Sequence, residues 1–192
     1  MARKLLYQTL KDKGNPDIVK RDGPYSCNWE NSWLGEGYYY WDTFIENAHW
    51  WGVNRHNDKY FICEAYCDYD IDKCFDLVGT TEHLLQFSGV IDLMKSKGLV
   101  NNKTTVSRIL NYMKHTIKVL KHESVRAYGI HTISRSKPEY EEFNFKLVFE
   151  IGKPQYLDYK PAIQICIFKK FGLNLRDYNL VFPYEYNDEY LA

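Results

Sequence analysis

The chain has 192 residues, enough for one domain with a core of its own. Its 25 Lys and Arg residues balance 25 Asp and Glu residues, which leaves room for no more than a local basic patch as a surface for nucleic acid or membrane. Aromatic residues make up 17% of the chain, too large a share for a disordered segment.

No apolar run approaches the roughly 20 residues of a membrane-spanning helix, and the N-terminus lacks the apolar core of a signal peptide. We therefore expect a cytoplasmic protein without a membrane partner. Its five cysteines are an odd number and widely spaced, which indicates free thiols. Cys63 and Cys67 lie four positions apart on an expected strand, but no second Cys or His pair has matching ligand spacing, so we expect no metal site.

The N-terminal part of the chain contains two expected strands and a short helix. Residues 4–10 form the first strand, and a helix over 16–20 begins with Pro16 at its first position. A polar loop over 21–32 leads to an aromatic strand over 33–42, which glycines interrupt.

A helix follows this aromatic strand. Thr43 and Glu46 have the spacing of a capping box, which predicts the start of the helix. Phe44, Ala48 and Trp51 would form its apolar face. We expect Gly52 to end it.

The rest of the chain contains a strand, two consecutive helices, a loop and three further strands. Periodicity predicts a strand over 60–69, a helix from about residue 80 to a stop at Gly98, a second helix over 103–122, a loop over 131–142, and strands over 143–151, 162–169 and 178–183. This order predicts a single α+β domain over residues 1–192, with strands at both ends and helices in the middle.

The stretch over 33–51 carries the least ordinary pattern. Gly35 and Gly37 flank a single residue, and three tyrosines, a tryptophan and Asp42 follow. Glycine inside a strand marks a bulge or a close approach of backbone to a ligand, and a row of aromatic side chains offers a stacking surface for a flat ring. The same aromatic residues also fit a packed core.

The segment LGEGYYYWDTFIENAHWW resembles the part of the ADP-ribosyltransferase superfamily, poly(ADP-ribose) polymerase branch, where a Gly-x-Gly-x-Tyr-Phe-x-Asp strand leads into a helix containing Ala. The matching positions are Gly35, Gly37, Tyr39, Tyr40, Asp42 and Ala48. The resemblance implies a split β-sheet core with helices packed around it, and NAD as the substrate, with its nicotinamide ring stacked on Tyr39.

Family members have a first strand with His or Arg, then this aromatic strand, then a strand with Glu near the C-terminus. Gln8, followed by Thr9, stands in the first position, and Gln164 in the third. A glutamine can hydrogen-bond a ribose hydroxyl or a carboxamide but supplies no charge. The resemblance therefore implies Tyr39 and Gln164 as catalytic residues and an NAD site formed by Gln8, Thr9, Gly35, Gly37, Tyr39 and Tyr40.

The family reaction releases nicotinamide through an oxocarbenium-like transition state, which a carboxylate stabilises. Because Gln164 has no charge, another carboxylate would have to act, and Glu141 is our candidate. Glu139-x-Glu141 has a spacing that some toxin branches use, although the acidic cluster also fits a solvated loop. Glu36, between the glycines, is near the expected site but is expected to point away from it.

The resemblance implies transfer of ADP-ribose from NAD to a macromolecular acceptor, protein or nucleic acid. Small members of this kind are often toxins or act in phage defence or counter-defence, which adds a cognate inhibitor protein as a partner. One alternative is a catalytically inactive domain that binds a nucleotide, ADP-ribose or a protein. Another is a structural module that binds protein through exposed aromatic residues. A cleft would favour the first two interpretations.

Overall fold

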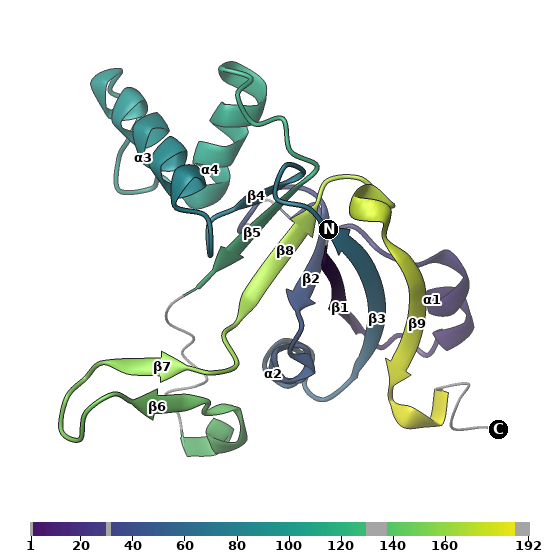
Figure 1. Cartoon of the computed structure of the whole chain (residues 1–192). Coiled ribbons are helices and arrows are strands. Elements are labelled where there is room, and N and C mark those ends of the chain that lie inside the picture. The colour runs from purple at the N-terminus through teal and green to yellow at the C-terminus, as the bar shows by residue number, and fades with distance from the viewer. Residues whose placement is uncertain (1, 30–31, 130–137, 187–192) are drawn as a thin grey trace.

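A mixed β-sheet organises the chain, whose structure is a computed structural model that describes residues 2–29, 32–129 and 138–186, without the side chains of 138–140 (Figure 1). Its strands are β1 (Ala2–Lys11), β2 (Tyr38–Asp42), β3 (Tyr60–Tyr69), β4 (Cys74–Asp76), β5 (Ser124–Tyr128), β8 (Ile163–Ile167) and β9 (Arg176–Phe182). They form a seven-stranded sheet in the order β4-β5-β8-β2-β1-β3-β9. The β4–β5 pair is parallel and the other pairs are antiparallel.

Helices pack around this sheet, and a separate hairpin extends from it. The α-helices are α1 (Pro16–Asp22), α2 (Ile45–His56), α3 (Thr81–Ser96) and α4 (Val106–Asn111), and α4 continues as a π-helical turn over Tyr112–Thr116. Short 3₁₀ helices cover Pro138–Phe143, Gly172–Asn174 and Tyr184–Tyr186, and the hairpin consists of β6 (Lys146–Val148) and β7 (Tyr156–Asp158). The expectation of a single α+β domain is confirmed.

Strand register assigns side chains to the two faces of the sheet. Tyr7 pairs with Trp41, and Trp41 pairs with Gln164, so these three side chains lie on one face. Ala48 and Trp50 of α2 pack on this face beside β1, and α3 and α4 pack on it farther along, over β5. The opposite face carries Tyr40 and the side chains around it, beneath β9 and the 3₁₀ helix at 172–174.

The sheet splits between β1 and β2. β1 pairs with β3 along its whole length, but it pairs with β2 only at Leu6–Asp42 and Tyr7–Trp41. Farther along, residues 25–27 fill the gap, because Cys27 bridges to Gly37 and the Gln8 side chain bonds the backbone of Tyr25 on both its N–H and its C=O. A side-chain amide thus takes the place of part of a strand ladder.

Several predicted elements are confirmed. The strand predicted over 60–69 is β3, with the same bounds. The helix predicted to stop at Gly98 is α3, which ends at Ser96, and Gly98 has the left-handed φ of +67° expected of a stop signal. The short helix predicted at 16–20 lies within α1.

The predicted boundaries of the helix after β2 are wrong at both ends. Thr43 does not cap it: Phe44 is the N-cap, and the Thr43 hydroxyl donates to the Asp42 carboxylate at 2.8 Å. Gly52 does not end it, because the helix continues to His56. A Cβ at Gly52 would lie 2.4 Å from the Tyr60 ring, so this glycine allows α2 to pack closely on β3.

The predictions for the chain on either side of β5 also need correction. The helix predicted over 103–122 is shorter, because α4 and its π-helical turn end at Thr116 and Lys118 adopts a left-handed φ of 57°. The strand predicted over 143–151 is reduced to β6, and β4 and β5 were not predicted. Most of the loop predicted over 131–142 lies outside the described residues.

The described residues contain no disulfide, no group arranged to hold a metal ion and no helix suited to span a membrane. All five cysteines are free, and burial raises the pKa of the Cys63 and Cys67 thiols to about 12. Within residues 2–29, 32–129 and 138–186, no group of three or more His, Cys, Asp or Glu side chains is arranged to hold a metal ion. No helix in these ranges is long and apolar enough to cross a membrane.

Candidate active site at the split of the sheet

A cavity of about 620 Å³ opens where β1 and β2 separate. Its floor is formed by Thr9, Tyr39 and Gln164, which come from β1, β2 and β8. One wall is the C-terminal half of α2, and the other is formed by residues from 25–29 and 32–33. Pockets for small ligands span about 300–1,000 Å³, so this cavity has the volume of a ligand site.

The structure gathers most of the predicted site residues in this cavity. Gln8, Thr9, Tyr39, Tyr40 and Gln164 all contribute to its lining. They come together because the three strands that carry them are neighbours in the order β8-β2-β1, although β8 lies far from the other two in the sequence. The aromatic strand is therefore both part of the core and the floor of a cleft.

Tyr39 offers a fixed ring to the cavity. Its hydroxyl donates to the Gly35 carbonyl at 2.6 Å and accepts from the Leu34 N–H at 2.8 Å. Burial raises the pKa of Tyr39 well above its ordinary value, so the phenol stays protonated. The side chain can stack against a flat ligand but is not free to transfer a proton.

Hydrogen bonds within the protein fix the Gln8 side chain at the edge of the cavity. Its side chain is only 4% exposed, and because it neighbours Tyr7 on β1 it points to the face opposite Gln164. Its amide donates to the Tyr25 carbonyl at 2.8 Å and accepts from the Tyr25 N–H at 3.0 Å and from the Tyr178 hydroxyl at 2.9 Å. Gln8 therefore positions one wall of the cavity.

The two glycines of the motif line a second cavity of about 410 Å³, between the start of β2 and α4. Gly35 has a φ of +90°, which favours glycine. At Gly37 a Cβ would lie 2.6 Å from Cys166 Sγ and 2.7 Å from the Ile167 carbonyl oxygen. Close packing against β8 thus explains Gly37 without any ligand.

The structure does not bring the predicted carboxylate to Tyr39. Glu141 is exposed on the 3₁₀ helix at 138–143 and does not line the first cavity, and Glu36 is exposed at the second. Among the described residues that line the first cavity, none is Asp or Glu. Gln164 is the polar side chain that reaches the floor from β8.

Cationic side chains at this cavity were missed from the sequence. Lys11, Lys13 and Arg55 all contribute to its lining. Burial lowers the pKa of neighbouring His56, and the charges of Arg55 and Lys11 lower it further, which indicates a positive potential there. Arg55 follows Trp51 by one helical turn, so both reach the same side of α2; that spacing was the available signal.

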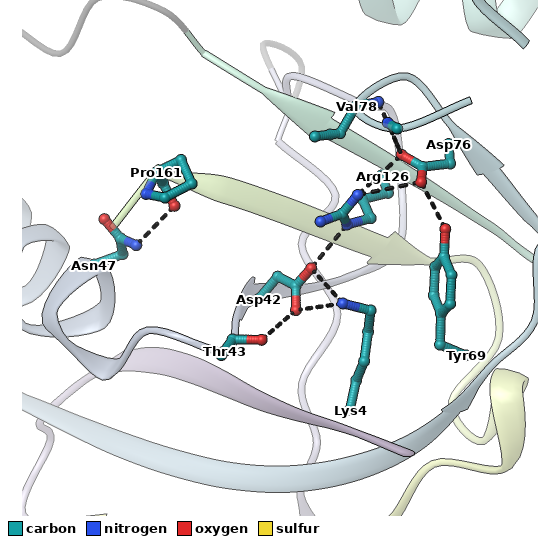
Figure 2. A network of polar contacts seen from close by, with 10 residues as sticks. Lys4, Asp42, Thr43, Asn47, Tyr69, Asp76, Val78, Arg126 and Pro161 are labelled. Atoms are coloured by element: carbon teal, nitrogen blue, oxygen red, sulfur yellow. Dashed lines mark hydrogen bonds and ion pairs between the residues drawn. The ribbon is translucent and has the colours of Figure 1, made fainter. Parts of the chain in front are cut away.

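The aspartate of the motif belongs to a buried ionic network on the other face (Figure 2). Asp42 is 2% exposed and accepts from Lys4 Nζ at 3.1 Å and from Arg126 Nε at 2.7 Å. Arg126 also bonds both carboxylate oxygens of Asp76 at 3.1 Å, and Asp76 accepts from the Tyr69 hydroxyl at 2.6 Å. The network joins β1, β2, β3, β4 and β5.

Protonation in this network follows from its hydrogen bonds. Burial alone would raise the pKa of Asp76, but the bonds from Tyr69 and the Val78 N–H, together with the charge of Arg126, bring that pKa below its ordinary value. The paired aspartates in turn raise the pKa of Arg126 against the effect of burial. Asp76 and Arg126 are thus charged at neutral pH, and the network clamps the sheet beside the split.

Comparison of this chain with protein-family models, with curated proteins and with solved structures finds no match.

Proposed function

We propose that the first cavity binds NAD and that the protein is an ADP-ribosyltransferase-like domain, which transfers ADP-ribose to a macromolecular acceptor. The observation that carries this proposal is the meeting of Tyr39 and Gln164 on the floor of one cavity. The resemblance singled out these residues by their order along the chain, and the neighbouring positions of β2 and β8 bring them together.

The cavity suits the parts of NAD. The Tyr39 ring offers a stacking surface for nicotinamide, and the Gln164 amide can hydrogen-bond a ribose hydroxyl. Lys11, Lys13 and Arg55 supply the positive charge that a pyrophosphate requires. A volume of about 620 Å³ lies within the range of small-molecule sites.

A second candidate function keeps the ligand without the reaction. The described lining contains no Asp or Glu, so no carboxylate stands ready to stabilise an oxocarbenium-like transition state. This observation favours a domain that binds NAD or ADP-ribose and leaves it intact. Catalysis by this chain would need Gln164 or Thr9 to orient the ribose. It would be slow because no carboxylate charge stabilises the transition state.

The two functions are separated by adding NAD labelled on its adenine ribose to the purified protein, with and without cell lysate. Nicotinamide release and label on a lysate component support transfer, whereas intact NAD with a rise in melting temperature supports the binding function. Gln164→Ala and Tyr39→Leu should abolish the response, and Tyr184→Ala, an exposed tyrosine outside the cavity, should not. Circular dichroism checks that each variant folds. If the protein neither cleaves NAD nor is stabilised by it, the proposal is overturned.

A further inference from the structure

Two tryptophans at the cavity remain substantially exposed. Trp29 is 51% exposed and Trp33 is 48% exposed, whereas Trp41 and Trp50 are buried in the core. Both exposed indoles lie on the wall that Gln8 anchors through Tyr25. Exposing large aromatic rings to water is unfavourable. Exposed rings beside a cleft therefore indicate a surface that contacts a ligand.

The Lys and Arg side chains among the described lining of this cavity meet no carboxylate there. Lys11, Lys13 and Arg55 line the cavity, and no Asp or Glu does so among its described lining residues, although the whole chain has a net charge of zero. The Arg55 guanidinium lies 5.4 Å from the centre of the Trp29 ring, so cation and indole form a continuous platform. A dinucleotide within the cavity has one pyrophosphate to present to these cations, which leaves the outer part of the platform for a second anionic ligand.

We propose that a single-stranded nucleic acid binds across this mouth and is the acceptor of the ADP-ribose; the inference rests on the proposed function. Single strands are held by cationic grooves that follow the phosphates and by aromatic side chains on which unpaired bases stack. An acidic peptide would be attracted by the same cations, but its Asp and Glu side chains carry no flat ring to match two exposed indoles. A duplex keeps its bases stacked inside and cannot present them to Trp29 and Trp33.

The transfer of ADP-ribose needs no reagent other than NAD and the acceptor. The bond between the nicotinamide nitrogen and ribose C1″ of NAD breaks, and nicotinamide leaves as a neutral molecule with the bonding electron pair. A lone pair on a nitrogen or oxygen of an unpaired base forms the new bond to C1″. The proton displaced from the acceptor atom passes to water.

Binding is tested with fluorescent 20-nucleotide single strands of DNA and of RNA, and with a duplex of the same sequence. We expect both single strands, or one of them, to bind more tightly than the duplex. Trp29→Ala with Trp33→Ala should weaken binding by about tenfold or more. Lys11→Gln and Arg55→Gln should each lower the slope of log affinity against log salt by about 1.

Matched controls change similar residues elsewhere. Phe171→Ala with Tyr184→Ala removes two exposed rings, and Lys103→Gln removes an exposed lysine; neither change touches the cavity lining. Both controls should bind single strands as the wild type does. Trp29→Tyr with Trp33→Tyr should restore most of the affinity, which a merely structural role for the indoles would not predict.

Transfer is then followed with labelled NAD and the same oligonucleotides, with and without cell lysate. Label that enters the single strand and is removed by nuclease supports the proposal. Label that enters lysate protein and resists nuclease overturns it, as does equal affinity for single strand and duplex. Stabilisation by NAD, measured without oligonucleotide, tests the proposed function separately. If NAD stabilises the protein but no oligonucleotide binds, the inference about the acceptor is overturned and the proposed function stands.

Discussion

Arg126 on β5 donates from Nε to the Asp42 carboxylate on β2 at 2.7 Å, across the intervening strand β8. The same guanidinium binds Asp76 on β4, so one side chain neutralises two buried carboxylates. Because these groups are shielded from water, removing one partner leaves an uncompensated charge.

Arg126→Met should therefore lower the free energy of unfolding by about 3–5 kcal/mol, as measured by urea denaturation. Arg176→Met is the control, because its ion pair with Asp68 at 2.8 Å is about one-third exposed. Exposed pairs contribute about 0–1 kcal/mol, so the control should change little. Equal losses in the two variants would show that the buried network is not a clamp.

Stability should fall as the solution becomes acidic, beginning near neutral pH. Burial lowers the pKa of His49, partly offset by Glu46, and burial also lowers the pKa values of His56 and His122. Below about pH 6.5 an unfolded histidine binds a proton that the folded one rejects, so protonation favours unfolding. The contribution of these histidines to the free energy of unfolding is complete above that pH and is lost as the pH falls through their lower folded-state pKa values.

His49→Gln should reduce this dependence. We expect a smaller drop in the free energy of unfolding between pH 7.5 and pH 5 than in the wild type, measured by urea denaturation at each pH. At pH 8, where the histidine is neutral in both states, the comparison isolates the packing change. An unchanged pH dependence in the variant would contradict the assignment to His49.

Gly37 should tolerate no side chain even without ligand. Gly37→Ala places a Cβ against Cys166 and the β8 backbone, and should lower the free energy of unfolding by about 1–3 kcal/mol. Gly89→Ala, in the exposed interior of α3 with nothing within 4 Å of the new Cβ, should instead stabilise by about 0.5–1 kcal/mol. If Gly37→Ala is as stable as the wild type but no longer binds NAD, Gly37 contributes to the ligand site rather than to packing.

Gln164→Glu should restore the missing charge. A carboxylate on the cavity floor would stabilise the oxocarbenium-like transition state, so we expect nicotinamide release to rise by about 100-fold. The rate is measured by chromatography of nicotinamide at saturating NAD. Gln155→Glu, an exposed position outside the cavity, is the matched control. No gain over this control would show that Gln164 does not face the ribose.

Local signals predicted the elements whose pattern is complete within a few residues. β3 alternates and is bounded by turns, and α3 has its glycine stop, so both were found. β4 and β5 are short strands whose partners lie far away in the sequence, and no local pattern marks them. The apolar periodicity through Leu120 continues past the end of α4, because that buried leucine packs on the core from a non-helical segment.

The candidate site was predicted in part for a similar reason. Tyr39 and Gln164 were assigned by motif and order, and β2 and β8 bring them together as neighbours. The role of Gln8 depends on which face it occupies and on Tyr25 and Tyr178, neither of which its own sequence neighbourhood reveals. Arg55, Lys11 and Lys13 converge only after α2 packs against β1.

The hydrogen bonds from Gln8 to Tyr25, and the bridge between Cys27 and Gly37, tie the segment bearing Trp29 to the sheet on both sides of the split. That wall is held by core residues rather than by a ligand. A ligand entering the cleft therefore meets a preformed surface and orders little chain on arrival. Free and occupied forms should share nearly the same backbone here, and substitutions at Gln8 should slow association by loosening the wall.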